Sequence, residues 1–206
     1  MTGPESVKIR DVARAAVRAQ LAEVAFDLFL RDGFEAVTIS DIASAAGVSR
    51  STVLRYFGTK EEAVLGTVDL RGGVVADALR ERPLDEDDWT ALRRAMDVAI
   101  EPYHRDHERA LALTRLIQET PALRTRLLEK QTSWQPLLAQ ALAERGSPSK
   151  APAVSDWVWA SAAVGCMNVA VGHWSASNGH IDLAGLVDEA FAALATPPEN
   201  GARLSK

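Results

Sequence analysis

Hydrophobic residues recur at helical spacing along almost the whole chain, and the alternating pattern of a β-strand does not appear. The first such segment ends at Gly33, a residue type that commonly terminates helices. A 3.6-residue period maintained over this length is typical of an all-α protein. We therefore predict an all-α fold of about nine helices, over residues 9–33, 38–46, 49–57, 59–82, 87–100, 109–119, 122–145, 153–177 and from 182 onwards.

The composition indicates a soluble cytoplasmic protein with no membrane partner. The single cysteine, Cys166, excludes an internal disulfide, and its apolar neighbours suggest a buried thiol. The N-terminus lacks the apolar segment of a signal peptide. The longest nearly apolar run, residues 157–171, is shorter than the roughly 20 residues that a spanning helix needs.

The charge distribution and the spacing of the helices suggest two domains. Residues 1–60 carry a net charge of +1, whereas the remainder carries −6. We predict a three-helix domain at 1–58, a larger helical domain at 59–196 and a flexible tail at 197–206.

The segment "AAGVSRSTVLRYFGTKEE", residues 45–62, has the layout of a helix-turn-helix. Gly47 would make the turn and Ser49 would cap the second helix. Helical spacing then directs one set of side chains inward, namely Val53, Tyr56 and Phe57. The opposite set would face a DNA major groove, and it consists of Arg50, Ser51, Leu54 and Arg55.

Residues around this helix are suited to phosphate contacts. Thr38 and Ser40 stand at the start of the preceding helix, where free N–H groups attract anions. Thr52, the Tyr56 hydroxyl and Lys60 flank the outward face. The competing interpretation is an ordinary solvated polar helix face, which the exposed leucine between two arginines makes less favourable.

Residues 17–65, with the pattern "T…DIA…AGVS" followed by an aromatic pair and "KEE", resemble the DNA-binding domain of the TetR family of bacterial transcriptional regulators. The resemblance implies a homodimeric regulator, usually a repressor, that binds a palindromic double-stranded operator and is released by a small ligand. Leu54 stands where the family commonly has tyrosine, so an apolar contact replaces a hydroxyl contact. The resemblance places DNA contacts at Ser40, Arg50, Ser51, Thr52, Leu54, Arg55, Tyr56 and Lys60.

Small residues near four-residue spacing on the segment 153–177 predict a close helix–helix contact between two protomers. The alternative is ordinary packing within one chain. Together with the apolar face of the last helix, the predicted interface comprises Ser161, Gly165, Gly172, Ala176, Leu183, Leu186, Val187 and Ala190.

An effector site in the larger domain would be an apolar cavity with a few polar groups, and each candidate could equally be core. Trp134 and Asn168 would supply the polar groups. The segment "LIQETPALRTRLLEKQTSW" is also similar to TetR relatives that bind acyl-CoA-like ligands, although the effector prediction does not depend on it. The candidates are Met96, Ile100, Leu113, Leu116, Ile117, Trp134, Leu138, Met167 and Asn168.

Catalytic, metal and cofactor sites are not predicted. His104 and His107 have the i, i+3 spacing of metal ligands, but Pro102 and the surrounding charges favour an exposed helix start. No arrangement of nucleophile, base and acid can be argued from the spacing. Two alternatives to a ligand-released repressor stay open: a small-molecule-binding or catalytic protein with a vestigial helix-turn-helix, and a regulator without an effector.

Overall fold

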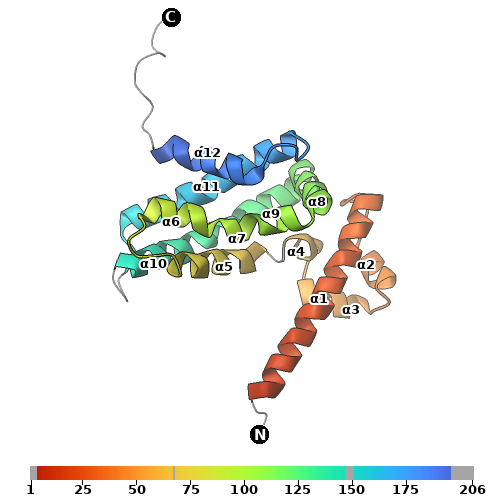
Figure 1. Ribbon diagram of the computed structural model, residues 1–206. Helices are drawn as coiled ribbons and strands as arrows, with labels where there is room; N and C mark the ends of the chain where they lie inside the picture. Colours follow the sequence, from red (N-terminus) through yellow and green to blue (C-terminus); the bar gives the residue numbers. More distant parts are fainter. Residues whose placement is uncertain (1–3, 67, 147–150, 196–206) are drawn as a thin grey trace, which may run out of the picture. The chain divides into compact units, whose positions relative to one another are not determined.

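The computed structural model describes residues 4–66, 68–146 and 151–195. Every regular element in these ranges is an α-helix, which confirms the predicted fold class (Figure 1). The described residues form twelve helices rather than about nine, because three predicted segments are each divided in two.

The first compact unit comprises Met1–Thr67 and Leu116–Leu127. Its helix α1 packs against α2 and α4, and α3 packs against α2 and α4. The unit extends past the domain boundary predicted at residue 58, since α4 packs on α1, and it includes a segment that the sequence grouped with the second domain. Its helices are α1 (Pro4–Asp32), α2 (Ile39–Ala45), α3 (Arg50–Phe57), α4 (Lys60–Leu65) and the first part of α9 (Pro121–Thr132).

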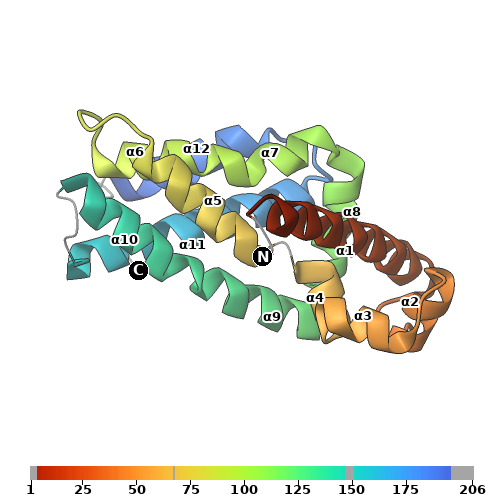
Figure 2. The ribbon, with the colours of Figure 1, turned by 90° about the horizontal axis from the view of Figure 1, so that it is seen from below.

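The second compact unit comprises Val68–Arg115 and Leu128–Lys206, of which the predicted tail at 197–206 lies outside the described residues. Within it α10 packs against both α5 and α11, and α12 packs against α11 (Figures 1 and 2). Its helices are α5 (Val68–Arg80), α6 (Asp88–Ala95), α7 (Asp97–Arg105), most of α8 (His107–Glu119), the end of α9, α10 (Trp134–Gly146), α11 (Val154–Ala176) and α12 (Leu183–Ala195).

Local chemistry explains two of the three helix divisions. α4 ends at Leu65 and is followed by Gly66, a residue type with low helix propensity. α9 and α10 are separated at Ser133, because Pro136 has no N–H to offer the carbonyl of Thr132 and its ring crowds that carbonyl. At the division between α6 and α7, Met96 keeps right-handed helical backbone angles.

Pro102 lies inside α7 and not at a helix start, which corrects the sequence interpretation. α7 ends at Arg105, and α8 begins at His107. His104 and His107 therefore lie on different helices, so their i, i+3 spacing does not place them on one helical face.

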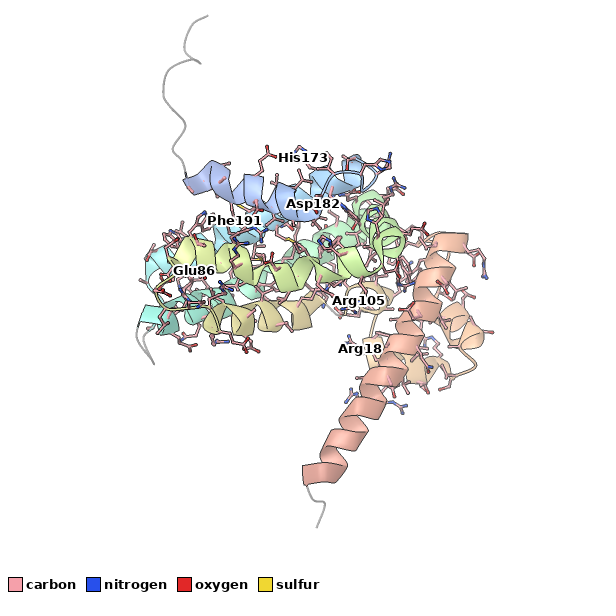
Figure 3. The ribbon with its side chains drawn as sticks, viewed as in Figure 1. Arg18, Glu86, Arg105, His173, Asp182 and Phe191 are labelled. Atoms are coloured by element: carbon pink, nitrogen blue, oxygen red, sulfur yellow. The ribbon has the colours of Figure 1, made fainter. Side chains whose placement is uncertain are left out.

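The last helix is fixed to the second unit by aromatic and ionic contacts that the sequence pattern did not reveal. Phe191 lies on α12 (Figure 3), and its ring centroid is 4.5 Å from that of Trp89 on α6. The Trp89 Nε1–H also donates to the Phe191 carbonyl at 3.1 Å. Arg93 is buried and donates to Asp97 at 2.6 Å and to Asp188 of α12 at 2.5 Å. Two carboxylates thus satisfy a guanidinium that would be costly to bury alone.

Helix α11 is longer than the apolar run that defined it. At 23 residues it is the one helix in the described ranges that is long and apolar enough to cross a membrane. The length argument against a spanning helix is therefore wrong, because the helix continues through Gly172, His173 and Trp174. It packs against α10 and α12 within the second unit, and 33% of its most apolar window is buried.

Candidate nucleic-acid interface

A glycine turn and a serine cap define the start of α3. Gly47 adopts φ +66°, a left-handed conformation that glycine accepts without a Cβ penalty. The Val48 N–H then reaches back to the Ala43 carbonyl at 3.0 Å and closes the end of α2. The Ser49 hydroxyl accepts from the Thr52 N–H at 3.1 Å, so the predicted N-cap is confirmed.

The outward face of α3 is presented as the sequence predicted. Arg50, Ser51 and Arg55 are exposed, whereas Val53 is 0% exposed and anchors the helix. Leu54 is partly exposed. Two guanidiniums therefore project from a short helix that is capped at one end and anchored in the core, which is the geometry required for bidentate contacts to base edges.

The hydroxyl groups at the start of α3 are linked to one another. Ser49 Oγ lies 2.9 Å from both the Ser51 Oγ and the Thr52 Oγ1. A hydroxyl can donate once and accept twice, so Ser51 and Thr52 retain capacity for a further partner. Their predicted contacts with DNA are compatible with this network.

Tyr56 is partly exposed and does not point fully inward, which corrects its predicted place beside Val53 and Phe57. At 100° per residue, Tyr56 lies about 80° from the centre of the buried face, at its edge. The Arg55 guanidinium lies 5.6 Å from the Tyr56 ring centroid, in cation–π range. The Tyr56 ring thus limits the conformations of a candidate base-contacting arginine.

The start of α2 already holds an anionic group. Thr38 and Asp41 form a capping box in which the Thr38 N–H and hydroxyl donate to Asp41 Oδ2 at 2.8 and 2.7 Å. The Thr38 hydroxyl, and then its N–H, hold the pKa of Asp41 below its ordinary value. A phosphate approaching this end would meet Asp41, and exposed Ser40 is the predicted contact residue beside it.

Lys60 is directed toward the protein and not toward solvent. Its ammonium donates to the Phe34 carbonyl at 2.8 Å, lies 4.3 Å from the Phe34 ring centroid and is 3.7 Å from Glu35. The side chain is 22% exposed. Lys60 therefore holds the turn after α1 in this structure, and its phosphate contact stays a prediction.

Two family models match this chain. The model for bacterial regulatory proteins of the tetR family matches residues 21–65, and the model for the MftR C-terminal domain matches residues 86–198, more than half of the chain. This chain belongs to the TetR family of bacterial transcriptional regulators. As a member of a non-enzymatic family, this TetR-family protein is a DNA-binding transcriptional regulator and not an enzyme.

Similar proteins agree with this assignment. The regulator TcmR of Streptomyces glaucescens is 29% identical over 148 residues, covering 69% of this chain and 66% of TcmR. The repressor Rv3405c of Mycobacterium tuberculosis is 35% identical over 85 residues, covering 41% of this chain and 43% of that protein. The chain thus matches less than two thirds of the length of these relatives.

A solved relative shares the TetR-family fold. The structure of FadR from Bacillus subtilis, in complex with stearoyl-CoA, has a TM-score of 0.58 and 20% identity, and the match covers 85% of this chain and 96% of FadR. Identity at this level shows the fold alone.

The predicted effector residues fall into both compact units of this TetR-family protein. Leu116 and Ile117 belong to the first unit, and the others to the second. Leu113 and Leu116 are half-buried. The fully buried candidates of the second unit are Met96, Ile100, Trp134, Leu138 and Met167.

Asn168 has a partner that sequence reasoning missed. Its Oδ1 accepts from the Nε2 of Gln131 on α9 at 2.7 Å. Gln131 is polar and almost fully buried. The sequence offered no signal for it, because a glutamine that directly follows Glu129 and Lys130 is typical of an exposed helix face.

The predicted dimer residues divide by exposure. Ser161, Gly165 and Ala176 are exposed along α11, and Gly172 is half-buried. On α12, Leu186 and Ala190 are half-buried. Leu183 and Val187, at 2% and 0% exposure, pack inside the protomer and have no surface to offer a second copy, which corrects their assignment to the interface.

Proposed function

We propose that this chain is a homodimeric repressor that binds an inverted-repeat operator through α3 and is released by a small effector bound in its second unit. The observation that carries the proposal is the outward face of α3, on which exposed Arg50 and Arg55 flank Leu54. A bacterial regulator of this kind acts on DNA in the cytoplasm.

The exposed stripe on α11 supports the dimer. Val158 and Val169, at 57% and 56% exposure, lie in line with the small residues Ser161 and Gly165. A Cβ at Gly165 would meet no atom of the protomer within 4 Å, so a second helix could approach the backbone there. Two copies would present two α3 helices to two half-sites, as an inverted repeat requires.

The proposed effector is an apolar or amphipathic small molecule. The buried side chains predicted to line its site are apolar, as ligand sites generally are. FadR of B. subtilis, which shares the fold, is described in complex with stearoyl-CoA. We include long-chain acyl-CoA thioesters among the effectors to be tested.

The deciding experiment is selection of bound duplexes from a random library, followed by footprinting. We expect enrichment of an inverted repeat whose affinity falls steeply with salt. An outcome with no enriched inverted repeat would contradict the proposal and favour a helix-turn-helix that no longer binds operator DNA.

Substitution of the two arginines gives the first prediction. Arg50→Ala or Arg55→Ala should each weaken operator binding by roughly 5- to 150-fold, since a bidentate base contact contributes about 1–3 kcal/mol. Arg105→Ala is the matched control, because Arg105 is exposed on α7 and paired with Glu101. Equal effects of all three substitutions in fluorescence anisotropy would count against base contacts by α3.

A further inference from the structure

The side chain of Gln131 is buried with half of its amide unsatisfied. The residue is 8% exposed, and its Nε2 donates to Asn168 Oδ1 at 2.7 Å. Its Oε1 is buried and has no hydrogen-bond partner, the one such side-chain atom found in the described part of the chain. A buried carbonyl oxygen without a donor is destabilising, and proteins seldom keep one without a reason.

Buried apolar side chains stand near this amide pair along its helices, and the buried Lys130 directly precedes Gln131. Val164 lies one turn before Asn168 on the same face of α11, and Trp134 follows Gln131 by three positions. Val164 is 5% exposed and Trp134 is 3% exposed. A few polar groups among buried apolar side chains are the usual composition of a small-molecule site.

We propose that Gln131 and Asn168 form the hydrogen-bonding head of the effector site, and that the effector presents a hydroxyl or N–H donor to Gln131 Oε1. The inference rests on the proposed function, because it names the chemistry of the effector. Asn168 holds the amide by accepting from Nε2, which leaves Oε1 as the group that faces the ligand. The carbonyl selects a donor and disfavours a carboxylate or an ether, neither of which can donate.

The donor requirement can be tested with pairs of probes that match in heavy-atom count. Decan-1-ol is compared with methyl nonyl ether, and 2-naphthol with 2-methylnaphthalene, by calorimetric titration of the full chain. We expect the alcohol and the naphthol each to bind about tenfold more tightly than its partner, since satisfying a buried acceptor is worth a factor of this size.

Substitution of the amide should remove that preference. Gln131→Leu lacks the acceptor and should bind both members of each pair equally. Gln135→Leu, at a half-buried position on α10, is the matched control and should keep the preference. If Gln131→Leu does not fold, Gln131→Met serves as the test variant.

Three outcomes would overturn the inference: equal or tighter binding of the non-donor probe, a preference that survives in the Gln131 variant, or no binding of any probe. Equal binding of alcohol and ether would indicate that the amide presents its NH2 instead. Operator binding is measured on the same samples, so that a failed effector prediction with intact operator binding leaves the repressor proposal standing.

Discussion

In the first unit, two residues predicted to lie near phosphate make hydrogen bonds within the protein that the sequence did not reveal. Lys60 was predicted to contact phosphate, yet its ammonium donates to the Phe34 carbonyl within the same unit. The Thr38 hydroxyl was predicted near phosphate, yet it donates to Asp41. Position in the sequence therefore does not distinguish a residue that would contact DNA from one that supports the helix-turn-helix.

Lys60→Met tests which of these roles dominates. Methionine keeps the apolar stem but loses the ammonium, so we expect the unit to be destabilised by about 1–3 kcal/mol. Hydrogen exchange of the α2 and α3 amides measures this, because all five tryptophans lie outside this unit. The slope of log affinity against log salt should stay unchanged. A decrease of about one in the magnitude of this slope, which corresponds to the loss of one phosphate contact, would show that Lys60 binds DNA directly.

Asp41 should titrate below its ordinary pKa, chiefly because the Thr38 hydroxyl donates to it. A carboxyl whose folded pKa is lowered contributes stability that is full above its ordinary pKa and is lost as pH falls through the lowered value. Carbon-detected NMR titration should show the pKa of Asp41 rising toward its ordinary value in Thr38→Val. Ser40→Ala, the control, removes neither Thr38 donor and should leave the pKa of Asp41 where it is in the parent.

At the scale of elements, two adjacent glycines of α5 differ in whether a side chain of another helix packs against them. Gly72 and Gly73 are adjacent in α5, but a Cβ at Gly72 would overlap the buried Trp134 ring, whereas a Cβ at Gly73 would meet nothing within 4 Å. Because Trp134 lies at the start of α10, Gly72 sets how closely α5 and α10 approach.

The two glycines should respond oppositely to alanine. Gly73→Ala should stabilise the second unit by about 0.5–1 kcal/mol, because alanine loses less backbone entropy in a helix. Gly72→Ala should destabilise it by about 1–3 kcal/mol through overpacking. Urea unfolding followed by tryptophan fluorescence reports this unit. Stabilisation by both substitutions would mean that α5 and α10 are not in close contact at Gly72.

At the scale of the whole molecule, recognition of an inverted-repeat operator requires two copies of the chain. A dimer also reconciles the net charge of −5 with DNA binding, because affinity depends on the donors presented locally and a dimer doubles them. The exposed stripe of α11 is the surface that would join the copies.

Gly165→Arg should weaken that association by at least tenfold while leaving the protomer folded, since Gly165 is exposed and a Cβ there would meet nothing within 4 Å. Sedimentation velocity over a concentration series measures the change. Gly146→Arg at the end of α10 is the control, because a Cβ there would likewise meet nothing within 4 Å and the residue lies on another helix. An unchanged oligomeric state in Gly165→Arg would place any dimer contact elsewhere.

The sequence by itself determined the helical class, the capping residues and the outward face of α3. These follow from local rules: the 3.6-residue period, and hydroxyl side chains that bond to backbone groups three residues away. Ser49 was predicted as a cap and accepts the expected N–H, and the hydroxyls of Thr38 and Thr59 cap α2 and α4 in the same way.

Only the tertiary structure decided which side chains far apart in the sequence meet. It pairs Arg126 with Glu62 at 3.0 Å, which places the start of α9 in the first unit. It likewise buries Gln131 against Asn168 and buries Leu183 and Val187 inside the protomer. Periodicity shows that a helix has a buried face, but the partner of that face depends on how the helices pack, and one sequence pattern is compatible with many packings.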